Sequence, residues 1–180
     1  MRSHLIDDEI LGSMVVLVDK REQPTGISEK RYKSFGVEYR RATLDYGDYT
    51  YNFTLPNGEI LYDESSRVYP EVMIERKMNL DELALCFGRE RKRFEAEMER
   101  AKSHDADIFL LVEDASWENL LNGKYRSKLN AKAYAASLIA WQIRYKIRVI
   151  FCKSETSGKL ISQILYRHLK ERLERGEFDG

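Results

Sequence analysis

Short apolar runs of strand length alternate with segments of helix length along most of this chain. Four of these runs are MVVLVD at 14–19, EVMIERK at 71–77, DIFLLVED at 107–114 and IRVIFC at 147–152. Strands that alternate with helices pack as a sheet covered by helices. The pattern therefore predicts an α/β domain with a mixed sheet.

The other expected elements come from turn and capping signals. We expect further strands at 36–44, 47–55 and 58–63, and helices at 79–102, 115–121, 130–146 and 156–175. Pro56-Asn57-Gly58 predicts a hairpin, because Asn-Gly tolerates the positive φ that tight turns need. Asn79 is a helix N-cap residue, and Gly88 is a weak point in the helix that follows.

The length of 180 residues suits one domain and leaves too little chain for a second. Hydrophobic residues make up 43% of the chain and charged residues 33%, as in soluble globular proteins. Gly12-Ser13-Met14 has the form of a cloning junction, so we expect residues 1–13 to be an N-terminal extension or a tag. The domain then covers 14–175, with a tail at 176–180.

Nothing in the sequence indicates a membrane protein or a secreted one. The longest apolar runs are too short to span a bilayer, and no signal peptide opens the chain. Cys86, Cys152 and three scattered histidines have neither zinc-site spacing nor the pattern of a disulfide framework. We therefore expect an intracellular protein without membrane association.

The charges are balanced overall but unevenly distributed. Thirty basic and thirty acidic residues give a formal net charge of zero, yet 119–154 contains no Asp or Glu. This segment carries eight basic residues: Lys124, Arg126, Lys128, Lys132, Arg144, Lys146, Arg148 and Lys153. Such local asymmetry can attract phosphate groups, although a solvated basic face would look the same.

Two opposite charges stand at the end of an expected buried strand. Successive side chains of a strand point to opposite faces, so Glu75 and Lys77 share a face and Arg76 points away. Buried charges are costly unless they are paired or bound to a metal. Glu75 and Lys77 therefore form either a structural ion pair or part of a functional site.

Three expected strands deliver carboxylates at or near their ends: Asp19, Asp48 and Glu75. Clustered carboxylates repel one another and are stable chiefly around a divalent cation. Mg²⁺ favours a few carboxylates together with water and phosphate oxygens. A lysine beside such a site, here Lys77, can act on a bound water or stabilise charge on phosphorus, so the combination suits phosphodiester hydrolysis.

These residues resemble a known family. VVLVDKRE, LDYGDY and VMIERKMNLDEL together resemble the nuclease domain of the XPF-type structure-specific endonucleases. The hallmark of that family is G-D followed by E-R-K-x-x-x-D, with a V-D-x-R-E strand before them. This chain has Gly47-Asp48, Glu75-Arg76-Lys77 with Asp81, and Val18-Asp19-Lys20-Arg21-Glu22, and the resemblance covers roughly 14–175.

The resemblance implies a restriction-endonuclease-like fold in a single domain. It also implies a divalent-metal-dependent endonuclease that cleaves DNA near flaps, forks or junctions, in DNA repair or recombination. The implied cofactor is Mg²⁺, with Mn²⁺ able to substitute. Such a protein would act in the cytoplasm, nucleoid or nucleus.

The implied site roles follow position by position. Asp48 and Glu75 would be the main metal ligands, Asp19 a further ligand, and Lys77 the residue that acts on the attacking water. Arg76, Asp81, Arg21 and Glu22 would orient the site or contact the phosphate backbone, although a buried pair of Arg76 with Asp81 is an equal alternative. Arg21 and the basic residues Lys124, Arg126, Lys128 and Lys132 are the candidate DNA contacts, and Glu22 a supporting residue.

The chain departs from the family pattern in two ways. The segment between Asp48 and Glu75 is longer than usual, and would be a DNA-gripping ribbon or a solvated decoration. The family also commonly adds a tandem helix-hairpin-helix module after the nuclease domain, whereas this sequence stops after the last expected helix. We expect either a compact viral or microbial version or an excised domain.

Two other functions remain open from the sequence. One is a non-catalytic DNA-binding scaffold of the same fold, and the other is a restriction-like nuclease that acts on unbranched DNA. The helical stripe Leu160, Ile161, Ile164, Leu165, His168 and Leu169 is either core or the seam of a homodimer through the C-terminal helices.

Overall fold

The computed structural model describes residues 4–178, so the ends of the expected N-terminal extension and C-terminal tail lie outside the described residues. The contacts group the chain into two compact units. The first unit holds 4–44, 49–68 and 158–178, and the second holds 45–48 and 69–157. Because the chain passes between the units several times, they are not domains that follow one another in sequence.

The first unit is a mixed sheet with helices. Its elements are α1 (His4–Gly12), β1 (Val15–Asp19), α2 (Gly26–Lys33), β2 (Tyr39–Leu44), β3 (Tyr49–Asn52), β4 (Arg67–Val68) and all but the first residue of α7 (Ser157–Glu174). Strand β1 pairs in parallel with β2 and antiparallel with β3, and β2 pairs in parallel with β4. The expected mixed sheet is therefore confirmed.

The core of the first unit is built on β1, whose five residues are all buried. Along α7, Ile161, Leu165 and Leu169 are fully buried. The helical stripe expected as core or dimer seam thus packs, at these three positions, inside the chain. In α1, Ile10 is fully buried, so the described part of the expected extension is a packed helix.

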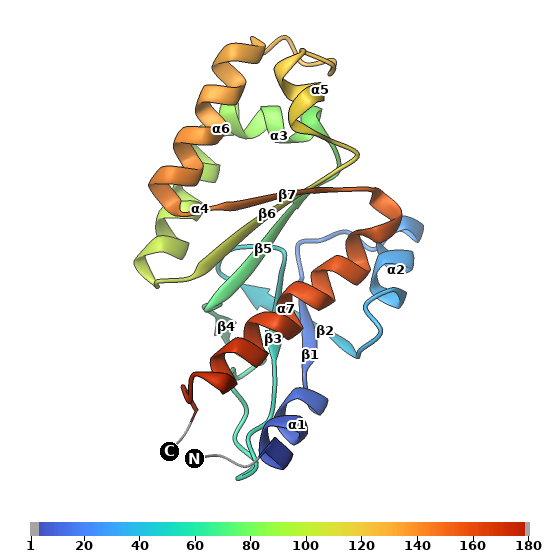
Figure 1. Ribbon diagram of the computed structural model, residues 1–180, viewed down its shortest axis with the longest axis vertical. Helices are drawn as coiled ribbons and strands as arrows, with labels where there is room; N and C mark the ends of the chain where they lie inside the picture. The colour runs from blue at the N-terminus through green and yellow to red at the C-terminus, as the bar shows by residue number, and fades with distance from the viewer. Residues whose placement is uncertain (1–3, 179–180) are drawn as a thin grey trace. The chain divides into compact units, whose positions relative to one another are not determined.

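The second unit holds three parallel strands and four α-helices. The strands are β5 (Val72–Lys77), β6 (Asp107–Glu113) and β7 (Arg148–Cys152), in that order. The helices are α3 (Leu80–Phe87), α4 (Arg91–Ser103), α5 (Trp117–Leu121) and α6 (Ala131–Tyr145), and a short 3₁₀ turn, Ser154–Thr156, follows β7. Figure 1 labels these strands and α-helices.

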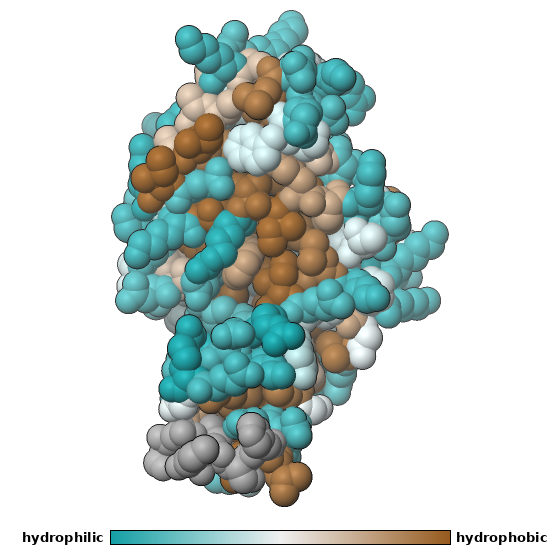
Figure 2. Space-filling model, in the orientation of Figure 1, coloured by the Kyte–Doolittle hydropathy of each residue, from teal (hydrophilic) through white to brown (hydrophobic). Residues whose placement is uncertain are grey.

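Aromatic side chains from three helices form the core of the second unit. Trp141 of α6 is 1% exposed and stacks on Phe94 of α4, with ring centroids 5.0 Å apart. Phe87 of α3 meets the same indole edge-on at 4.9 Å. The outer side of α6 is apolar in part: Figure 2 shows apolar atoms there, where Ile139 and Ile143 are 47% and 78% exposed.

The structure differs from the expected elements at two places, the helix at 79–102 and the strand at 58–63, and it confirms the predicted turn at 56–58. The helix expected at 79–102 divides at Gly88 into α3 and α4. The turn at Pro56-Asn57-Gly58 forms, with the Leu55 N–H donating to the Glu59 carbonyl at 2.7 Å. The strand expected at 58–63 does not form beyond a single bridge between Thr54 and Ile60, because the chain bends away afterwards.

Helix α2 and strand β4 were not expected from the sequence. Helix α2 has the sequence GISEKRYK, which lacks a clear apolar stripe. It starts instead from a capping box in which the Thr25 and Ser28 side chains each accept a hydrogen bond from the other residue's backbone N–H.

No helix within 4–178 is both long and apolar enough to cross a membrane.

Candidate active site

Glu75 and Lys77 form a buried ion pair at the end of β5. Lys77 Nζ donates to Glu75 Oε1 at 2.5 Å, and the two residues are only 8% and 6% exposed. The predicted common face of these side chains is therefore confirmed. The centroid of the Phe94 ring lies 5.4 Å from Lys77 Nζ, so the ammonium group also makes a cation–π contact.

The surroundings of Lys77 keep it charged. Burial alone would lower the pKa of Lys77, but the negative charges of Glu75 and Asp48 raise the pKa above its ordinary value. Lys77 is therefore an ammonium group that donates hydrogen bonds at neutral pH. The buried Cys86 nearby is a thiol, because burial raises its pKa to about 12.

Asp48 is fixed against β5 by its backbone and by its side chain. Its N–H donates to the Ile74 carbonyl at 2.9 Å, and its Oδ2 accepts the Arg76 N–H at 2.7 Å. The residue between these two contacts on β5 is Glu75. The Asp48 carboxylate is thus held beside the strand end that carries Glu75 and Lys77.

The backbone conformation and the surroundings of Gly47 explain why a glycine precedes Asp48. Its φ is +78°, and a Cβ at this position would lie 2.7 Å from Met73 Cβ. Its N–H donates to Glu97 Oε1 at 2.8 Å. Only glycine meets both the left-handed backbone and the close approach to β5, so the G-D motif is a requirement for placing Asp48.

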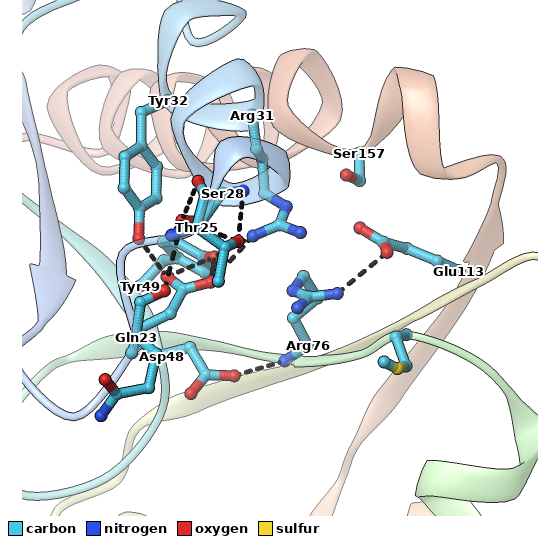
Figure 3. A network of polar contacts seen from close by, with 12 residues as sticks. Gln23, Thr25, Ser28, Arg31, Tyr32, Asp48, Tyr49, Arg76, Glu113 and Ser157 are labelled. Carbon is cyan, nitrogen blue, oxygen red and sulfur yellow. Dashed lines mark hydrogen bonds and ion pairs between the residues drawn. The ribbon is translucent and has the colours of Figure 1, made fainter.

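Arg76 points away from the Glu75–Lys77 pair, as strand alternation predicts, and pairs with a residue that the sequence did not single out. Its Nη1 donates to Glu113 Oε2 at 2.9 Å, as Figure 3 shows. The alternative pairing of Arg76 with Asp81 is therefore wrong. Glu113 is the last residue of β6. The sequence signal that could have found it is the apolar run of β6 ending in a carboxylate, as the run of β1 ends in Asp19.

Asp81 binds the basic loop between α5 and α6. Its Oδ1 accepts the N–H groups of Arg126 and Ser127, both at 2.7 Å, and its Oδ2 accepts Arg126 Nε at 3.4 Å. Burial opposes the charge of Asp81, but these backbone and side-chain donors lower its pKa overall. Asp81 therefore ties the start of α3, just after Lys77, to this loop.

The four predicted DNA contacts of this region are exposed. Lys124, Arg126 and Lys128 lie on the loop at 122–130, and Lys132 lies in the first turn of α6. The Arg126 side chain is 90% exposed although it contacts Asp81. The loop held by Asp81 thus presents positive charge to solvent.

In the first unit, Asp19 holds a turn at the end of β1. Its Oδ1 accepts the Arg21 N–H at 2.9 Å and Arg21 Nε at 2.5 Å, and its Oδ2 accepts the Leu44 N–H at 2.8 Å. Asp19 is 2% exposed, whereas the Arg21 side chain is 62% exposed. Asp19 thus joins the ends of β1 and β2, and its assignment as a further metal ligand stays a prediction.

Glu22 is the centre of a polar network in the same unit. Its carboxylate accepts the Tyr49 hydroxyl at 2.6 and 2.7 Å, the Tyr32 hydroxyl at 2.9 Å and Arg31 Nη1 at 2.8 Å. Figure 3 shows Arg31, Tyr32 and Tyr49 gathered in this network. Glu22 therefore holds Arg31, Tyr32 and Tyr49 together within the first unit, and its supporting role at the site stays a prediction.

The donor set suits a hard divalent cation. Asp48 and Glu75 supply carboxylate oxygens on neighbouring segments, and Mg²⁺ is commonly held by one or two carboxylates together with water and phosphate oxygens. Across 4–178, no group of three or more His, Cys, Asp or Glu side chains is arranged to hold a metal ion. Of the three predicted metal ligands, Asp48 and Glu75 are the two that lie in the second unit.

Solved structures identify the fold. XPF from Aeropyrum pernix matches with a TM-score of 0.56 and 22% identity over 83% of this chain. The same protein in complex with DNA matches with a TM-score of 0.58 and 22% identity over 87% of this chain. This chain spans 64% and 65% of those two chains. The fold is therefore the restriction-endonuclease-like α/β fold of the XPF nuclease.

The sequence identifies the family. Residues 18–164 match the ERCC4 domain, and the chain belongs to this family. The resemblance to the XPF-type nuclease domain, first drawn from the motifs around Asp19, Asp48 and Glu75, is thereby confirmed. No curated protein sequence matches the chain.

Proposed function

We propose that this protein is a metal-dependent DNA endonuclease that hydrolyses phosphodiester bonds near branched structures. The observation that carries the proposal is the buried Glu75–Lys77 pair with the Asp48 carboxylate fixed to the same strand. A purely structural ion pair needs no second carboxylate beside it. The family and the fold shared with a protein solved in complex with DNA support the same function.

Asp48 and Glu75 would hold the divalent cation, Mg²⁺ or Mn²⁺. When bound, this ion supplies Lewis acidity and lowers the pKa of a coordinated water. The protein contributes the placement of the carboxylates: Gly47 allows the close approach of Asp48, and the Arg76 N–H orients the carboxylate. Arg76 in turn is held by Glu113, which suits a positioning role.

Lys77 would supply positive charge where negative charge develops on the phosphate. Its ammonium group is oriented by Glu75 and by the Phe94 ring, so little reorganisation is needed when substrate binds. It would also orient the attacking water by hydrogen bonding. The assignment requires that Lys77 stays protonated, as its raised pKa indicates.

The exposed basic loop at 122–130 would contact the phosphate groups of the DNA backbone. Lys124, Arg126, Lys128 and Lys132 are exposed and have the chemistry of phosphate contacts, which position DNA without reading its sequence. Asp81 would act through this loop, which it holds in place, and not as a metal ligand. Arg21 is a further exposed candidate contact.

A cleavage panel tests the proposal. Flap, fork, four-way junction and plain duplex DNA are incubated with the protein and Mg²⁺ or Mn²⁺, next to Asp48→Ala, Lys77→Ala and the control Lys92→Gln, an exposed lysine on α4. We expect nicking of the branched substrates that the first two variants lose and the control keeps. Equal rates on duplex and flap would favour a restriction-like nuclease, and binding without cleavage would favour a scaffold.

Pairing of two copies is a further part of the proposal. The stripe predicted as a seam on the C-terminal helix α7 is buried at Ile161, Leu165 and Leu169, so we place the contact on α6 instead. The apolar side chains of Ile139 and Ile143, one turn apart on α6, are exposed and would be covered in a homodimer. Light scattering across a concentration series should show a dimer that Ile143→Glu weakens. A monomer at all concentrations would remove this part without affecting the nuclease assignment.

A further inference from the structure

A second basic site lies at the opposite end of the strands from Glu75 and Lys77. A cavity of about 280 Å³ is lined by the end of α4, the loop into β6, the end of α6 and the start of β7. Figure 1 shows the chain entering β6 and β7 on the same side of the second unit. Strand β6 is seven residues long, or about 20 Å, so the cavity is distinct from the candidate active site.

Positive charge predominates around this cavity. Its cationic lining residues are Lys102, Arg144, Lys146 and Arg148, and its anionic ones are Asp105 and Asp107. Arg148 Nη1 already pairs with Asp107 Oδ1 at 2.7 Å, which partly neutralises that carboxylate and fixes the guanidinium. Lys102, Arg144 and Lys146 are exposed and accessible from solvent. Arg144 Nη1 also lies 3.9 Å from Glu95 Oε1, a long contact that neutralises its charge only in part.

Tyr145 arranges two of these cations. Its buried ring lies 5.8 Å from Lys102 Nζ and 5.8 Å from Arg144 Cζ. Cation–π attraction at such distances holds long side chains near one place at a modest free-energy gain. The cations are therefore partly preorganised instead of being spread over a solvated face.

The backbone around the cavity is also unusual. Within 4–178, three residues other than glycine have positive φ, and two of them, Asp105 and Lys146, line this cavity with φ of 54° each. Lys146 is the C-cap of α6, a position where glycine is normally favoured. Lysine is less favourable than glycine in this left-handed conformation, yet the chain carries a lysine here.

We propose that this cavity binds a phosphate group. Lysine and arginine side chains that converge on a concave surface are the usual ligands of phosphate oxygens, and the volume accommodates a phosphate or pyrophosphate. The phosphate comes either from the backbone of a nucleic acid strand or from a small phosphate compound. The site does not depend on the proposed nuclease activity, because it shares no residue with it.

The test is a titration of the ¹⁵N-labelled full chain with inorganic phosphate and then pyrophosphate, in EDTA. Saturable amide shifts at 105–107 and 145–148 are expected for the unmodified protein. Lys146→Gly keeps the left-handed backbone and removes the ammonium group, and with Lys102→Gln it should weaken binding at least fivefold. The control Lys92→Gln lies on the same helix as Lys102, outside the cavity, and should leave binding unchanged.

Shifts that do not saturate, or that persist unchanged in the double variant, would overturn the proposal. Duplex DNA titrations of the same proteins at several salt concentrations then distinguish the two sources of phosphate. A weaker affinity with a salt slope reduced by about one for the double variant identifies a DNA strand as the ligand. An unchanged affinity for DNA, with phosphate binding lost, identifies a small phosphate compound.

Discussion

Asp81 Oδ1 accepts the backbone N–H of Ser127 at 2.7 Å and so ties the start of α3 to the loop between α5 and α6. A second N–H, from Arg126, binds the same oxygen at 2.7 Å. The last residue of the E-R-K-x-x-x-D motif therefore connects the strand that carries Glu75 and Lys77 with the basic loop.

Asp81→Ala should weaken DNA binding more than it slows catalysis. Loss of the two backbone contacts frees the loop, so we expect a roughly three- to tenfold weaker affinity and a rate at saturating DNA within about threefold of normal. Asp81→Asn keeps an acceptor oxygen and should have a smaller effect. Binding by fluorescence anisotropy and single-turnover cleavage check this. A rate reduced about a hundredfold at saturating DNA would instead place Asp81 in the catalytic machinery.

Lys77→Met should destabilise the protein as well as inactivate it. The change leaves the buried Glu75 carboxylate without its ammonium partner, which costs roughly 3–5 kcal/mol in comparable pairs. Adding Glu75→Gln removes the unpaired charge, so the double variant should regain much of the stability but none of the activity. Urea unfolding at pH 7 without metal measures the coupling. The four proteins compared are the unmodified chain, Lys77→Met, Glu75→Gln and the double variant. Additive losses would show that the two side chains are not coupled.

Gly47→Ala should destabilise the chain more than Gly58→Ala. Both glycines have positive φ, +78° and +87°, so both changes introduce backbone strain of about 1 kcal/mol. A Cβ at Gly47 also meets Met73, whereas nothing lies within 4 Å of one at Gly58. We expect an additional loss of about 1–3 kcal/mol for Gly47→Ala in thermal unfolding. Equal losses would show that the close approach of Asp48 to β5 is not constrained at Gly47.

Both cysteines should react slowly with iodoacetamide in the native protein. Burial raises the pKa of Cys86 to about 12 and that of Cys152 to about 11, so almost no thiolate is present at pH 8. Because the thiolate forms only as pH rises toward these values, alkylation should accelerate steadily from pH 8 to pH 10. Mass spectrometry of the labelled chain measures each site, with the urea-unfolded chain as the fast control. Native labelling as fast as in urea would contradict the burial.

Local patterns predicted the parts of the structure that depend on neighbouring residues. Strand alternation placed Glu75 and Lys77 on one face, and the cap at Asn79 and the weak point at Gly88 mark where α3 begins and ends. These features depend on spacings of one to four residues. The family motifs extended the prediction to the fold.

The partners that lie far apart in sequence were not predicted. Arg76 pairs with Glu113 because β5 and β6 are parallel neighbours, which the sequence of either strand does not reveal. Asp81 and Arg126 are 45 residues apart, and their contact depends on how the α5–α6 loop packs against α3. Helix α2 was missed because its capping box, and not an apolar stripe, starts it.

The most direct test of the central claim is single-turnover cleavage of a flap substrate in saturating Mg²⁺ by the unmodified protein, Asp48→Asn and Lys77→Met, with Lys92→Gln as the control. If Asp48, Glu75 and Lys77 form the hydrolytic centre, both variants should lose at least about a hundredfold in rate while still binding the flap. Cleavage by either variant at the rate of the unmodified protein would contradict the account.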